Sequence, residues 1–124
     1  MMLALSSALP AFAQATIDVP CIQNAIEVRE TAISNAIDTF AFTVKAALVV
    51  RKNALKAAWT LTTRDARRDA IRAARQTFDN AVKDAIDAKK DAKKTAASTF
   101  KTTMKDTCHQ NPSDTTMEGS DGKL

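Results

Sequence analysis

Residues that could ligate a metal or act in catalysis are few in this 124-residue chain, which has one His, two Cys and no Tyr. His109 follows Cys108, but a structural zinc ion takes four such ligands and only Cys21 remains. Ser and Thr are plentiful, yet a hydroxyl nucleophile needs an adjacent base, and the single imidazole lies near the end of the chain. The acidic side chains stand at helical spacing from Lys or Arg, as Asp79 does from Lys83, which is typical of solvated helices. These patterns predict no catalytic residue, no metal site and no cofactor, and therefore a protein that is not an enzyme.

Arginine is the residue type whose spacing suggests binding chemistry. Residues 51–75 contain eight basic and two acidic side chains, a local net charge of +6 in a chain whose total is +4. Four of the arginines follow one another at intervals of four, four and three, which places them on one helical face: Arg64, Arg68, Arg72 and Arg75. Because guanidinium groups capture phosphate or carboxylate in a bidentate manner, this face is a candidate site for DNA, anionic lipid or an envelope polymer. The alternative is a solvated face that keeps an Ala-rich helix soluble.

Long helices must carry these arginines, because residues 21–111 contain neither Pro nor Gly. Apolar residues recur there every eleven positions. The columns of the first helix are Ile22, Ile33, Val44 and Leu55, then Ala25, Ala36, Ala47 and Ala58, then Ile26, Ile37, Leu48 and Trp59. Those of the second are Ile71, Val82 and Met104, with Lys93 as the exception in that column, then Ala74, Ala85 and Ala96. Eleven residues make three turns at about 3.67 residues per turn, so each column runs nearly straight along a relaxed helix.

The eleven-residue frame slips between Leu55 and Ile71, which predicts a turn at that point. Thr62, followed three residues later by Asp65, is the predicted N-cap of the second helix. The expected helices are therefore about 21–61 and 63–107, and the alternative is one uninterrupted helix.

The two cysteines favour the hairpin, because the midpoint between Cys21 and Cys108 falls inside the predicted turn. Folding there would bring both sulfurs to one end, and a Cys pair in an exported chain is expected to be oxidised. The predicted fold is thus an all-α, antiparallel long-helix hairpin over 21–108, closed by a terminal disulfide. Free thiols or an intermolecular pair are the alternatives.

The two ends differ in composition from this helical body. Residues 1–13 have the apolar run and small-x-small ending of a secretory signal peptide, although the basic start of such signals is absent, which suggests an upstream start codon. The apolar run is too short to cross a bilayer, so no transmembrane segment is expected. Residues 14–20 would be a short linker and residues 109–124 a disordered polar tail. The expected location is the periplasm or the cell surface.

A second set of apolar residues lies off the main stripe of the first helix, at Val28, Phe42 and Val49. A two-helix hairpin cannot cover both sides of one helix. We expect a second copy to pack there, giving a homodimeric four-helix bundle, and a protein partner or a lipid surface is the alternative.

The segments KNALKAAWTLTTRDARRDAIRAA and CIQNAIEVRETAISNAIDTF resemble small uncharacterised secreted helical proteins of ultra-small, candidate-phylum bacteria. This resemblance implies no known activity and no site residue. DAIDAKKDAKKTAAS is similar to the eleven-residue repeats of desiccation-protective, lipid-associating helical proteins, from which the large Ile and Phe residues of the first helix depart. The expected function is that of a non-enzymatic, exported structural or protein-interaction protein of the cell envelope; the alternative is a polyanion-binding protein that uses the Arg-rich turn.

Overall fold

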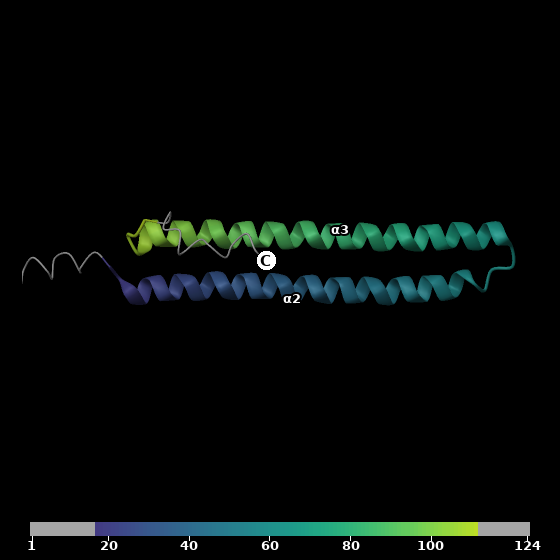
Figure 1. Ribbon diagram of the computed structural model, residues 1–124, viewed down its shortest axis with the longest axis horizontal. Helices are drawn as coiled ribbons and strands as arrows, with labels where there is room; N and C mark the ends of the chain where they lie inside the picture. Colours follow the sequence, from purple (N-terminus) through teal and green to yellow (C-terminus); the bar gives the residue numbers. More distant parts are fainter. Residues whose placement is uncertain (1–16, 112–124) are drawn as a thin grey trace, which may run out of the picture. The chain divides into compact units, whose positions relative to one another are not determined.

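The computed structural model describes residues 17–111, which form two long helices and one short one. Helix α2 spans Val19–Ala58, α3 spans Arg64–Thr102, and the π-helix η1 follows at Thr103–Thr107; the described residues include no strand. The two long helices pack against each other as a hairpin (Figure 1). The prediction of an all-α hairpin is therefore confirmed. The predicted signal peptide lies outside the described residues, as do residues 14–16 of the predicted linker and 112–124 of the predicted tail.

Helix α2 begins inside the stretch that composition had suggested was a linker. The N–H of Cys21 donates to the Asp18 carboxylate at 3.1 Å, and the N–H of Ile22 donates to the Asp18 carbonyl at 3.1 Å. Pro20 fits the first helical turn, where its missing N–H removes no helical hydrogen bond. Asp18 is therefore the N-cap, and α2 starts at Val19.

The turn between the helices is capped on both sides. The N–H groups of Thr60 and Leu61 donate to the Ala57 and Ala58 carbonyls at 3.0 and 3.2 Å, which closes α2 in tight three-residue steps. On the other side the N–H of Ala66 donates to the Thr63 hydroxyl at 3.2 Å. The prediction that Thr62 is the N-cap was wrong by one residue, because α3 begins at Arg64 and the hydroxyl that accepts from its first turn belongs to Thr63. The helices accordingly end at Ala58 and begin at Arg64 rather than at 61 and 63.

The described residues divide into two compact units, the first formed by residues 17–33 with 93–111 and the second by Ser34–Ala92. The first unit contains the core with the larger side chains, in which Ala25, Phe100, Met104 and Cys108 are buried. Its two helical segments are joined by the predicted Cys21–Cys108 disulfide, whose Cα atoms are 5.6 Å apart. The disulfide is confirmed.

A π-helical turn keeps Cys108 on the buried side of this core. On an α-helix, steps of four residues drift by about 40° around the axis, so the series Phe100, Met104, Cys108 would rotate away from α2. In η1 the N–H of Cys108 instead reaches the Thr103 carbonyl, five residues back, at 3.0 Å. The wider turn offsets part of the drift, and both Met104 and Cys108 are buried.

In the second unit every buried residue is an alanine: Ala36, Ala47, Ala58, Ala74 and Ala85. Consecutive members on each helix are eleven residues apart, and Ala25 and Ala96 continue the two series in the first unit. The predicted alanine columns are thus the helix contacts within each unit. The neighbouring column was expected in the same stripe, but Ile37, Leu48 and Trp59 are exposed. A seam of methyl groups is narrow and does not cover a residue one position further round the helix.

Candidate anion-binding site

The candidate site is built on the turn, and Arg67 holds its two sides together. One Nη of Arg67 donates to the Leu61 carbonyl at 2.9 Å, and its guanidinium carbon lies 5.5 Å from the centre of the Trp59 ring. This side chain therefore satisfies a backbone acceptor of the turn and covers one face of the indole. Trp59 nevertheless remains 69% exposed.

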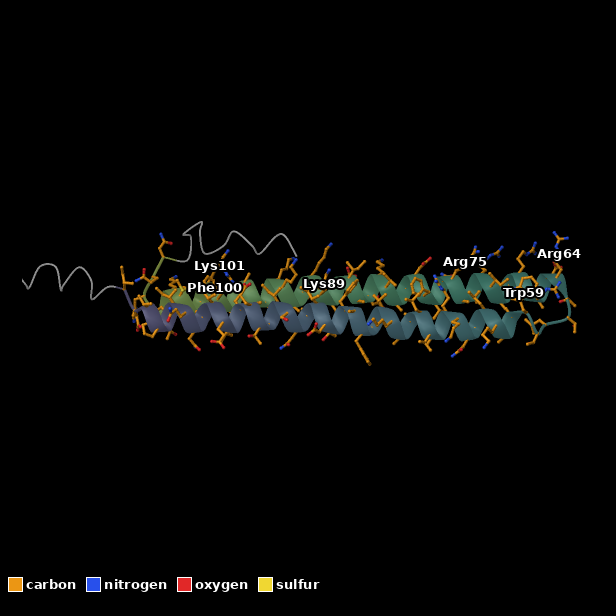
Figure 2. All side chains as sticks on the ribbon, turned by 60° about the horizontal axis from the view of Figure 1, so that its bottom comes forward. Trp59, Arg64, Arg75, Lys89, Phe100 and Lys101 are labelled. Carbon is orange, nitrogen blue, oxygen red and sulfur yellow. A yellow bond between two sulfur atoms is a disulfide. The ribbon has the colours of Figure 1, made fainter. Side chains whose placement is uncertain are left out.

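A groove of about 460 Å³ follows the turn along α3 within the second unit. It is lined by Trp59, Arg64, Arg67, Arg68, Ile71, Arg72 and Arg75. Figure 2 shows Arg64 and Arg75 projecting from the part of α3 nearest the turn, where Trp59 also lies. All four arginines that the spacing singled out are exposed and line this one groove, Arg75 included.

The groove keeps a net positive charge after its own ion pair is counted. Arg68 lies 3.6 Å from the Asp65 carboxylate, and both side chains are largely exposed. An exposed pair of this kind contributes about 0–1 kcal/mol, so an incoming phosphate or carboxylate can replace it at little cost. Guanidinium groups along a groove, beside an aromatic face, can bind anions through bidentate hydrogen bonds.

Sequence reasoning missed three members of this groove, Trp59, Arg67 and Ile71, the last of which it had assigned to an apolar column of the second helix. The eleven-residue column assigned Trp59 to the buried stripe, whereas α2 ends one residue earlier, at Ala58. The position of Trp59 in the sequence could have indicated its exposure, because it is the last member of its column before the eleven-residue frame slips. Arg67 was counted only as charge, since its bond to Leu61 depends on the path of the turn.

The second unit also contains an apolar groove of about 620 Å³. Alanines from both helices form most of its lining, together with Val50, Leu61 and Phe78. The Arg51 guanidinium carbon lies 4.3 Å from the centre of the Phe78 ring. Elsewhere in this unit the Lys89 ammonium lies 4.5 Å from the Phe40 ring centre. Thr60 and Leu61 line the apolar groove, so it reaches the same turn as the arginines.

The residues proposed as an interaction face are exposed on α2. Val28 lies in the first unit, and Phe42 and Val49 lie in the second, where Phe42 is 74% exposed. By length and composition α2 is apolar enough to cross a membrane, and little of its most apolar stretch is buried. A core helix of a soluble protein or a signal sequence passes the same test, so this does not distinguish a membrane span from an uncovered face.

Within residues 17–111 no group of three or more His, Cys, Asp or Glu is placed to hold a metal ion, and both cysteines belong to the disulfide. No family model matches the chain, and neither a curated protein nor a solved structure is similar to it. The features that bear on function are therefore the arginine groove and the exposed apolar residues of the hairpin.

Proposed function

We propose that this protein is an exported, non-enzymatic interaction protein that binds a polyanion through the arginine groove at its turn. The observation that carries the proposal is that Arg64, Arg68, Arg72 and Arg75 line one groove with Trp59. The disulfide supports export, because such bonds persist in oxidising compartments. Export also accords with the signal-like composition of residues 1–13.

The test is a charge swap of the four arginines to Glu, with binding to heparin, DNA and anionic vesicles measured over a salt series. The wild-type affinity for a duplex should fall by about 0.9 log units per decade of salt for each phosphate neutralised, because the contacts release counterions. The variant should lose binding and its salt dependence. Its helicity should persist, since all four side chains are exposed.

A matched control carries the same change in charge away from the groove, with Lys45, Lys83, Lys90 and Lys94 replaced by Glu. All four lysines are exposed, and none of them lines the arginine groove. The control should retain most of the binding. Equal losses in the two variants would mean that net charge alone attracts the polyanion, and no retention of the wild type at low salt would refute the proposal.

Self-association is a second candidate role, favoured by the composition of the second unit. Its buried residues are all alanines, while Phe42 and Val49 are exposed on α2. A second copy packed on this face would bury apolar area that the hairpin itself leaves in water.

Replacing Phe42 and Val49 by Lys should convert a dimer into a monomer while far-UV helicity is retained. Size-exclusion chromatography with light scattering gives the mass of each species. The control replaces exposed Gln76 and Ser98 on α3 by Lys, which adds the same charge without touching the apolar face. A wild-type protein that is monomeric at tens of micromolar would contradict self-association.

A further inference from the structure

The turn combines charge with exposed apolar side chains. Trp59 is 69% exposed and Leu61 is 39% exposed, and both follow the end of α2 directly. Arg64, Arg67 and Arg68 come within the next seven residues of the chain. Large apolar side chains in water at the tip of a turn are unfavourable unless something covers them.

Two surfaces of different chemistry meet at this turn. The arginine groove includes Trp59, and the apolar groove includes Thr60 and Leu61. A linear polyanion such as DNA or heparin would use the arginines and one indole face, which Arg67 partly covers. It would leave Leu61 and the apolar groove that this residue lines in water.

A lipid surface fits both features. Indole rings favour the boundary between lipid headgroups and acyl chains, and arginine side chains extend towards the headgroups while their stems remain among apolar groups. Anionic headgroups complement the +6 net charge of residues 51–75. We infer that the turn inserts Trp59 and Leu61 into an anionic lipid surface, with the surrounding arginines on the phosphate groups. This inference rests on the proposed function and names its partner.

Trp59 is the only Trp in the chain, so its fluorescence reports on the turn alone. The oxidised protein recovered after export is titrated with vesicles of phosphatidylglycerol and phosphatidylcholine, with pure phosphatidylcholine vesicles, and with heparin and single-stranded DNA. With the anionic vesicles we expect a blue shift of the emission and quenching by lipids brominated on the acyl chain. Neutral vesicles should bind at least tenfold more weakly, because they offer no net charge to the arginines.

A pair of variants separates insertion from charge attraction. Leu61→Gln removes an apolar side chain from the turn, and Ile86→Gln removes one of nearly equal exposure, 38%, from α3. The first should weaken binding to anionic vesicles roughly three- to tenfold without changing heparin affinity, because only lipid covers Leu61. The second should change neither. Far-UV circular dichroism verifies that both variants keep their helices, and the quenching by brominated lipid needs no variant.

The outcomes distinguish this inference from the proposed function. Binding to heparin, DNA and anionic vesicles with similar affinity, without a blue shift or bromine quenching and without an effect of Leu61→Gln, would overturn lipid insertion and leave a polyanion site. An equal effect of both Gln variants would also overturn it, because the turn would then have no special part. No binding to any anionic probe at low salt would overturn both proposals.

Discussion

Phe100 and Phe42 show how one residue type takes opposite roles in this molecule. Phe100 is buried in the first unit, and its ring lies 4.3 Å from the guanidinium carbon of Arg29, which is itself only 6% exposed. Arg29 also donates from Nε to the Glu30 carboxylate at 3.0 Å. Its charge is thus balanced while its guanidinium lies over the ring. Phe42 in the second unit is largely in water.

Phe100→Ala should therefore destabilise the protein by about 3–5 kcal/mol, because it removes a buried aromatic side chain and leaves a cavity beneath Arg29. Phe42→Ala should change the free energy of unfolding by no more than about 0.5 kcal/mol in the monomer. Urea unfolding followed by circular dichroism measures both. A similar loss in the two variants would contradict the burial pattern.

Among single residues, the sequence predicted that an arginine-rich surface exists near the turn, but it did not predict every residue that lines the groove. The four arginines were identified from spacing alone, since side chains three or four residues apart share a helical face. Trp59 was misplaced because helix periodicity applies only up to the residue where the helix ends. The function of Arg67 was out of reach, because its partner Leu61 is six residues away across a turn.

A side-chain cap marks the start of each long helix, and for α3 two adjacent residues could have served as the cap. Thr62 and Thr63 are both hydroxyl residues before a helix, and only Thr63 accepts from the N–H three residues on. The cap on α2 is likewise Asp18, with Pro20 inside the first turn.

Thr63→Ala should reduce stability by about 1 kcal/mol, since it leaves the N–H of Ala66 without its side-chain acceptor. Thr62→Ala is the matched control and should cost less than about 0.5 kcal/mol. Thermal unfolding of the two variants compares them directly. A larger loss at Thr62 would favour the cap position expected from the sequence over the one observed.

The elements themselves were largely predictable from the sequence, because one period of eleven runs through both helices. Alanine at positions 25, 36, 47 and 58 marks the seam, and its small side chain lets the partner helix approach closely. The π-helical turn at Thr103–Thr107 was not predictable in this way. It follows from the need to present Cys108 to Cys21 after a series of four-residue steps.

Across the whole molecule, the disulfide offsets a weakness of the core. Large buried side chains gather in the first unit around Phe100 and Met104, whereas the buried residues of the second unit are all alanines. Alanine contacts contribute little apolar area, so helix pairing there yields a small free energy. Restricting the unfolded chain is an independent source of stability.

Replacing Cys21 and Cys108 by Ser should lower the free energy of unfolding by about 4.6 kcal/mol on the chain-entropy model, because the bridge spans a sequence separation of 87. Urea unfolding with and without reductant gives the comparison. Reductant should destabilise the wild type and have no effect on the double Ser variant. Equal stability of the oxidised and reduced wild type would show that the bridge does not constrain the unfolded chain.

The bridge also makes residues 21–108 a closed covalent ring, with the turn as its most arginine-rich arc. A protease that cuts after arginine would open this ring at Arg64, Arg67 or Arg68. Both fragments would remain attached through sulfur, and the nicked protein would be heavier by one water molecule for each bond cut. A cut at the turn would thus break the covalent link between the two helices there while the disulfide kept the molecule in one piece. Intact mass would reveal the added water, and electrophoresis would separate the two fragments only after reduction.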